Sequence, residues 1–119
     1  MKPVVIYGSS ITQGGCASRP GMCYTVIAGR LADVPIVNMG FSGNGKMELE
    51  MSGILAGIDA SAYVLDCLWN MEPDLLRERF EPFVRALHAR CPAAPILLAE
   101  DGNVLGLAPT EKAEIIRSV

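Results

Sequence analysis

The sequence lacks a long hydrophobic run, a cluster of basic residues and all but one histidine. No apolar stretch approaches the roughly 18 residues of a membrane-spanning helix, and the apolar stretch near Met1 is only about five residues long. We therefore expect a soluble chain without a targeting segment, in a compartment that the sequence does not reveal. Ten basic and thirteen acidic residues give a formal net charge of -3, which predicts no binding to nucleic acid or to an anionic membrane. The expected partner is a small molecule.

Metal-ligand spacing is also missing. The four cysteines show no CxxC pattern and occur at Cys16, Cys23, Cys67 and Cys91. With a single histidine beside them, they predict neither a metal site nor a bound cofactor. Cys67 lies in a strand-like run and is interpreted as a small core residue. Cys16 and Cys23 are near enough in sequence to pair in an oxidising compartment, but spacing alone does not establish a bridge, and reduced thiols are the expectation.

Four short apolar runs alternate with stretches of helical period. The runs are Pro3 to Tyr7, Pro35 to Met39, Ala62 to Trp69 and Pro95 to Ala99. This alternation predicts an α/β fold with a parallel sheet whose strands are buried on both faces. A length of 119 residues suits one domain, residues 1-119.

Apolar residues at helical spacing predict three core-facing helices. The first stripe is Tyr24, Ile27, Ala28 and Leu31; the second is Met47, Met51, Ile54, Leu55 and Ile58; the third is Leu76, Phe80, Phe83, Val84, Leu87 and Cys91. Pro82 is expected to kink the third helix or to start a second segment. Thr110 is predicted to cap a fourth helix of about two turns.

Polar residues follow each apolar run. They are Ser10, the glycine-rich segment 40-45, Asn70, and Asp101 with Asn103. Because the carboxyl ends of parallel strands share one edge of a sheet, we expect all of these residues at that edge. Ligands of such sheets bind there.

Ser10 is the candidate nucleophile at this edge. It lies in the turn Gly8-Ser9-Ser10-Ile11-Thr12-Gln13-Gly14, and a serine on such a turn presents its hydroxyl to a substrate once a base removes the proton. The Ser10 N-H, the Gly43 N-H and the Asn70 amide are candidate donors to an oxyanion. The structural alternatives are a turn serine bonded to its own backbone, a positive φ at Gly43, and a helix cap by Asn70.

Three blocks of the sequence resemble the SGNH or GDSL hydrolases, a family named for blocks that carry Ser, Gly, Asn and His. The blocks are residues 8-14, 38-43 and 66-71, and they span most of the chain. The resemblance implies a flavodoxin-like three-layer α/β/α sandwich with strand order 2-1-3-4. It also implies a serine esterase or acylhydrolase for small acyl esters, including acylated carbohydrates, with Ser10 as nucleophile and Gly43 and Asn70 as the oxyanion hole.

The chain departs from this family pattern at several places. Ser9 stands where the family usually has aspartate, and residues 68-71 lack the usual glycine and final aspartate, as in a branch that resembles sugar-ester hydrolases. The fourth block, Asp-x-x-His, and a fifth strand have no match. The resemblance therefore implies a domain incomplete at its C-terminus, impaired hydrolysis, and an open sheet edge through which copies self-associate. His88 is predicted to be a surface residue roughly 20 Å from the site.

Other residues near the predicted site have weaker assignments. Ser9, Arg19 and Met71 are candidates for substrate binding above Ser10, although an exposed arginine and a core methionine are the ordinary interpretations of the last two. The segment 46-50, with Lys46, Glu48 and Glu50, is interpreted as the solvated face of the second helix. Glu100 and Asp101 are expected to cap or solvate the fourth loop.

Two other functions remain open from the residues themselves. Backbone N-H groups after the first strand suit a phosphate- or flavin-binding module, but the chain has no Walker lysine and its glycine-rich turn follows the second run instead of the first. The remaining alternative is a non-catalytic fragment that keeps the sandwich without activity.

Overall fold

A computed structural model describes residues 1-101 and 109-119, and these residues form a four-stranded parallel sheet of order β2-β1-β3-β4. The strands are β1 (Val4–Gly8), β2 (Ile36–Gly40), β3 (Ala62–Asp66) and β4 (Ile96–Leu98). The predicted α/β class and strand order are confirmed. Gly8 pairs in register with Gly40 on one side and with Asp66 on the other, so three strands end level with one another.

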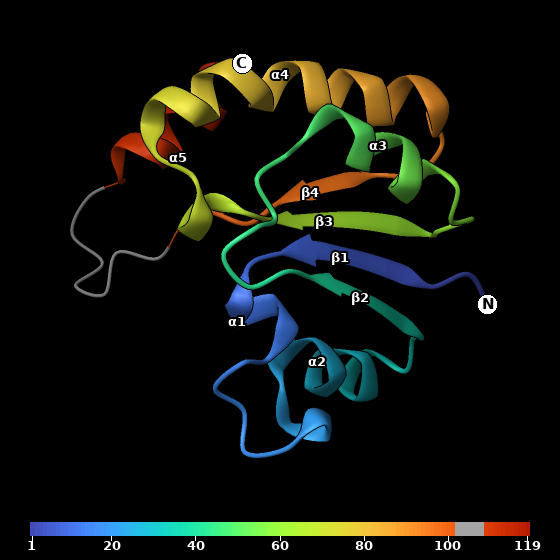
Figure 1. Cartoon of the computed structure of the whole chain (residues 1–119). Coiled ribbons are helices and arrows are strands. Elements are labelled where there is room, and N and C mark those ends of the chain that lie inside the picture. The colour runs from blue at the N-terminus through green and yellow to red at the C-terminus, as the bar shows by residue number, and fades with distance from the viewer. Residues whose placement is uncertain (102–108) are drawn as a thin grey trace.

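Helices cover both faces of the sheet, which gives the three layers that the sequence predicted (Figure 1). The helices are α1 (Ser10–Gln13), α2 (Tyr24–Ala32), α3 (Leu49–Ala56), α4 (Pro73–Arg90) and α5 (Glu111–Arg117), with 3-10 turns η1 (Pro20–Met22) and η2 (Leu68–Asn70). Figure 1 shows α1 and α2 on one face and α3 and α4 on the other, and α5 packs against α4. No helix in the described ranges is both long and apolar enough for a membrane span.

The hydrophobic core lies between the sheet and the α3-α4 layer. Tyr7 stacks on Phe83 with ring centroids 5.6 Å apart. The buried residues of α4 are Leu76, Phe80, Phe83 and Leu87, which confirms the central part of the third predicted stripe. The helix continues through Pro82, which lies on its exposed side, so no second segment starts there.

The predicted core face of α2 is wrong. Tyr24 is 39% exposed and Leu31 is 84% exposed, whereas the buried residues of this helix are Thr25 and Gly29. A Cβ at Gly29 would lie 2.6 Å from Cγ1 of Ile36. The helix thus packs closely on β2 because Gly29 has no side chain. The periodicity of apolar residues does not reveal a contact of this kind.

The second predicted stripe is only partly a helical face. Met47 is buried, but it precedes α3 and has a φ of 53°, and Ile54 on α3 is 55% exposed. The Met47 N-H donates to the Tyr7 hydroxyl oxygen at 3.2 Å. Met47 therefore joins the core from a loop that the strand β1 holds in place.

Burial on both faces holds for β1 and β3 but is wrong for the outer strands β2 and β4. Leu97 and Leu98 of β4 are 54% and 36% exposed. Among the described strands, β4 pairs only with β3. An apolar, unpaired edge of this kind is a template for further pairing.

The remaining local predictions concern a helix cap and the cysteines. Thr110 caps α5 as predicted, since its hydroxyl oxygen accepts the N-H of Ala113 at 3.1 Å. Cys67 is fully buried in the core, as predicted. All four thiols are unpaired; Cys16 is exposed and Cys23 is buried.

Candidate active site

A one-turn helix presents Ser10 at the carboxyl edge of the sheet. Ser9 is the N-cap of α1, and its Oγ accepts the N-H of Ile11 at 3.3 Å. Gly14 ends the helix with a φ of 86°, a left-handed conformation that glycine adopts without steric cost. Ser10 is the first helical residue and is half-buried. The hydroxyl of Ser10 therefore sits on a short, capped turn directly after β1.

The loop that carries Gly43 crosses the end of β1 beside this turn. The Phe41 N-H donates to the Gly8 carbonyl at 2.9 Å, and the Ser42 N-H donates to Oε1 of Gln13 at 2.8 Å. Gly43 has a φ of 70°, so the structural role considered for it is present. A Cβ built at Gly43 meets no atom within 4 Å. The turn at Gly43 therefore faces open space, where a ligand has room to approach.

Asn70 reaches the same loop from η2, after β3. Its Nδ2 lies 3.4 Å from the carbonyl oxygens of Phe41 and Asn44. Both distances exceed the usual 2.7 to 3.2 Å of an N-H···O bond, so these contacts are weak. The cap of α4 is Glu72, and the interpretation of Asn70 as that cap is wrong.

The structure thus brings the Ser10 turn, the Gly43 loop and Asn70 to one edge, but it separates the weaker candidates. Ser9 and Met71 are fully buried, Ser9 as a helix cap and Met71 in the core, and neither has surface to offer a substrate. Arg19 is exposed at the start of η1.

Two described acidic residues follow the fourth strand, and both have partners among the described residues. Asp101 accepts a hydrogen bond from the Thr110 hydroxyl, and Glu100 forms an ion pair with Arg117 at 2.6 Å. Asn103 lies outside the described residues. Loop capping and solvation, the roles expected for Glu100 and Asp101, match these contacts.

His88, the only histidine of the sequence, is far from this edge. It is exposed in the last turn of α4, whereas the first turn of that helix adjoins Asn70. His88 lies fifteen positions after Pro73, which corresponds to about 22 Å along the helix axis. His88 therefore cannot take the proton from Ser10.

The family model described as GDSL-like Lipase/Acylhydrolase family matches residues 1–114. The chain belongs to the GDSL-like lipase/acylhydrolase family. The resemblance seen in the three blocks is thereby confirmed. No curated protein sequence matches the chain.

Solved structures support the same fold. A protein of Bacteroides ovatus ATCC 8483 assigned to the GDSL-like lipases is 37% identical, with a TM-score of 0.87 over 99% of this chain and 37% of its own. The salicylyl-acyltransferase SsfX3 from a tetracycline biosynthetic pathway is 20% identical, with a TM-score of 0.78 over 99% of this chain and 37% of its own. The D162A mutant of esterase AlinE4 is 19% identical, with a TM-score of 0.65 over 97% and 67% of the two chains. The chain therefore spans about a third of the length of the first two.

Two polar clusters near this edge of the sheet were not predicted from the sequence. The carboxylate of Asp66 accepts hydrogen bonds from Thr12 and Tyr24 beneath the Ser10 turn. Burial, reinforced by the hydrogen bond to Asp66, raises the pKa of Tyr24 well above its ordinary value, so its hydroxyl remains a donor. Spacing could not have shown this cluster, because its members come from three separate elements.

The second cluster shows that Glu48 is not only a solvated residue. Its Oε2 accepts the Tyr7 hydroxyl at 3.1 Å and the Lys46 N-H at 3.2 Å, and Arg79 lies 3.8 Å from its Oε1. Partial burial raises the pKa of Glu48, but hydrogen bonds from its own backbone and from Tyr7 outweigh this effect and lower it. The cluster holds the end of the Gly43 loop on β1.

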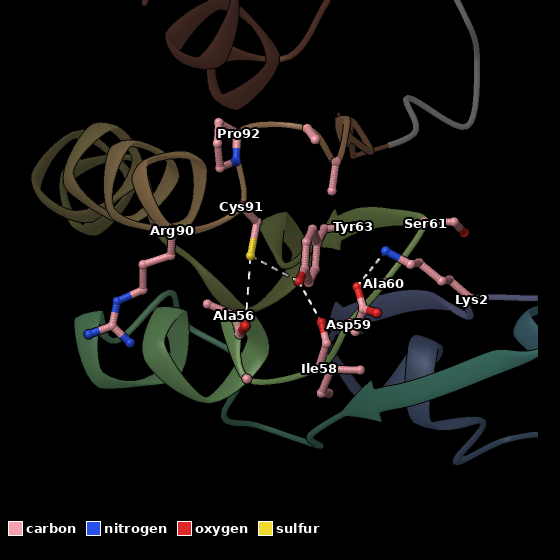
Figure 2. A pocket seen from close by; sticks show the side chains of 13 residues that line it. Lys2, Ala56, Ile58, Asp59, Ala60, Ser61, Tyr63, Arg90, Cys91 and Pro92 are labelled. Carbon is pink, nitrogen blue, oxygen red and sulfur yellow. Dashed lines mark hydrogen bonds and ion pairs between the residues drawn. The ribbon is translucent and has the colours of Figure 1, made fainter.

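A pocket of about 540 Å³ lies at the opposite, amino-terminal edge of the sheet (Figure 2). Several of its polar groups bond to one another. The Tyr63 hydroxyl donates to the Ile58 carbonyl at 2.8 Å and contacts Sγ of Cys91 at 3.3 Å, and Lys2 pairs with Asp59 at 2.8 Å. The pocket is separate from the edge that carries Ser10, Gly43 and Asn70. In the described ranges, no group of three His, Cys, Asp or Glu side chains is arranged to hold a metal ion.

Proposed function

We propose that Ser10, the Gly43 turn and Asn70 form the nucleophile and oxyanion hole of a serine esterase or acylhydrolase that acts on small acyl esters. The observation that carries this proposal is the convergence of the three at one sheet edge, where Asn70 Nδ2 lies 3.4 Å from carbonyls on both sides of Gly43. Membership of the family supports the same chemistry.

In the proposed reaction, Ser10 Oγ attacks the ester carbonyl carbon while a base accepts the hydroxyl proton. The carbonyl oxygen becomes an oxyanion, which the N-H groups of Ser10 and Gly43 and the amide of Asn70 stabilise. The ester C-O bond then breaks, the alcohol leaves with a proton, and water hydrolyses the acyl-Ser10. Loss of one oxyanion donor typically costs about 3 to 4 kcal/mol of transition-state stabilisation.

The single histidine of these 119 residues, His88, cannot accept the proton, because it lies at the other end of α4. Loss of a catalytic base reduces turnover by on the order of 10⁶. We therefore expect slow turnover by the chain alone, and acceleration of Ser10 acylation by added imidazole as a free base.

A mass-spectrometric assay tests this proposal. The chain is incubated with p-nitrophenyl acetate and imidazole, and the acetylated residue is identified by peptide mapping. We expect an acetyl group on Ser10 that is absent from Ser10→Ala, and acetylation that is about 10²- to 10³-fold slower in Asn70→Ala. Ser61→Ala is the matched control, since Ser61 is an exposed serine at the opposite edge. Labelling that Ser10→Ala leaves unchanged would refute the proposal.

The acyl and alcohol groups are proposed only by class. Rates of Ser10 acetylation measured with acetylated monosaccharides and with simple alkyl acetates compare acylated carbohydrates with other small esters. The structure offers less for the phosphate- or flavin-binding alternative, because α1 has four residues and Ser9 Oγ already occupies the N-H of Ile11.

A further inference from the structure

A buried carboxylate lies directly beneath the Ser10 turn. Asp66 ends β3, is only 8% exposed and pairs in register with Gly8. Its Oδ2 accepts the Thr12 hydroxyl at 2.8 Å and the Tyr24 hydroxyl at 2.6 Å. None of the ion pairs among the described residues includes Asp66. Two neutral hydroxyl groups therefore compensate this charge inside the protein.

Thr12 connects this carboxylate to the nucleophile turn. It is fully buried and lies two residues after Ser10 on α1. The Thr12 hydroxyl donates a hydrogen bond to Asp66 on β3. The Thr12 carbonyl accepts a hydrogen bond from Nδ2 of Asn38, on β2, at 2.7 Å. A Cβ at Gly8 would overlap the Thr12 hydroxyl, so the Thr12 side chain occupies the space that a side chain at Gly8 would need. Hydrogen bonds from both neighbouring strands thus hold the turn of Ser10.

The cost of burying a carboxylate argues that this arrangement does more than fill space. Burial of an unpaired charge is unfavourable unless hydrogen bonds compensate it, and bonds to a carboxylate are shorter and stronger than those between neutral groups. An apolar residue would pack at this position without that cost. A charged acceptor instead fixes the rotamer of Thr12 on the same turn as Ser10.

We propose that Asp66 is a positioning residue, which through its hydrogen bond to Thr12 sets the place of Ser10 relative to the oxyanion donors. This inference rests on the proposed function of Ser10. A displacement of about 1 Å at a reacting group reduces rates by on the order of 100-fold, so an anchor two residues away has a kinetic effect.

Thr12 and Tyr24 provide a matched pair of variants to test this inference. Both donate to the same carboxylate oxygen, but only Thr12 belongs to the turn of Ser10. The variants are Thr12→Val, which keeps the shape and removes the hydroxyl, Thr12→Ser, which keeps the hydroxyl, and Tyr24→Phe. The first measurement is the rate of Ser10 acetylation by p-nitrophenyl acetate with imidazole.

The second measurement is hydrogen exchange at the Gln13 and Gly14 amides, which bond to the carbonyls of Ser9 and Ser10, each at 3.0 Å. We expect Thr12→Val to slow acetylation by on the order of 10- to 100-fold and to speed this exchange. We expect Thr12→Ser to restore both. We expect Tyr24→Phe to change both less than Thr12→Val does, because the Tyr24 hydroxyl lies 3.4 Å from that of Thr12 but is not part of the turn.

Each alternative result decides the inference. It is overturned if Thr12→Val behaves as the parent, if Thr12→Ser gives no rescue, or if Tyr24→Phe slows acetylation as much as Thr12→Val. If Ser10→Ala keeps the label, the proposed function fails, and the exchange at Gln13 and Gly14 alone decides whether Asp66 anchors the turn.

Discussion

The close approach of α1 to the end of β2 makes Gly40→Ala a sharp test of how the site is built. A Cβ at Gly40 would lie 2.6 Å from Cα of Gln13 and 2.7 Å from the carbonyl carbon of Thr12. Ordinary carbon-carbon contact is about 3.5 Å or more, so the two segments must separate by about 1 Å. Because the contacted atoms are backbone atoms, no side-chain rotation relieves the overlap. The helix that carries Ser10 must move.

The size of the effect follows from this displacement. Overpacking of this kind costs about 1 to 3 kcal/mol, which lowers Tm by on the order of 4 to 12 °C at about 4 °C per kcal/mol. A shift of Ser10 by about 1 Å slows its acetylation by on the order of 100-fold. Thermal unfolding followed by circular dichroism measures the first effect, and the p-nitrophenyl acetate assay measures the second.

Gly53→Ala is the matched control. Gly53 lies within α3, where an added Cβ meets only the end of the flexible Arg90 side chain, at 3.1 Å. The same chemical change there is expected to stabilise the helix by up to about 1 kcal/mol and to leave acetylation unchanged. A Gly40→Ala variant with the Tm and the acetylation rate of the parent would refute the reasoning.

Three further outcomes are expected. Thr110→Ala removes the acceptor for the Ala113 N-H and should lower the free energy of unfolding in urea by about 1 kcal/mol, with Thr110→Ser close to the parent. The pKa of Glu48 is lowered, so its carboxylate stabilises the folded protein at pH values above the ordinary pKa of 4.5, and this contribution is lost as the pH falls through the pKa of the folded state. The difference in free energy of unfolding between the parent and Glu48→Gln should therefore shrink on acidification. A difference that grows would contradict this. If the β4 edge mediates self-association, Leu97→Lys should reduce the mass measured by light scattering at high concentration, and an unchanged mass would exclude that edge.

The sequence predicted the sheet and the polar residues at its carboxyl edge because both depend on local signals. Continuous apolar runs mark parallel strands, and polar residues after each run mark where the strands end. The shared edge of Ser10, Gly43 and Asn70 could be expected because the carboxyl ends of parallel strands meet at one edge, and the family resemblance supplied the strand order. Thr110 was also predictable, because a cap is recognised from its own neighbours in sequence.

The parts that sequence could not predict depend on contacts between distant elements. The α2 helix turns Thr25 and Gly29 inward, since close packing on β2 needs a small residue and Thr25 has a polar partner in Asn38. A pattern of apolar residues predicts neither the close approach of Gly29 nor the hydrogen bond of Thr25. The sequence predicted no separate role for Asp66, because its partner Thr12 is 54 positions away in sequence.

Asn38 connects the segments on one side of the site through three hydrogen bonds. Its Nδ2 donates to the Thr12 carbonyl at 2.7 Å and to the Thr25 hydroxyl at 2.9 Å, while its Oδ1 accepts the Gly40 N-H at 2.9 Å. One amide on an outer strand therefore ties α1 and α2 to β2. These segments should open as a single cooperative unit, so any fluctuation that frees the edge strand also releases the helix turn that carries Ser10. The position of Ser10, the proposed nucleophile, is in this way coupled to the local stability of the sheet edge.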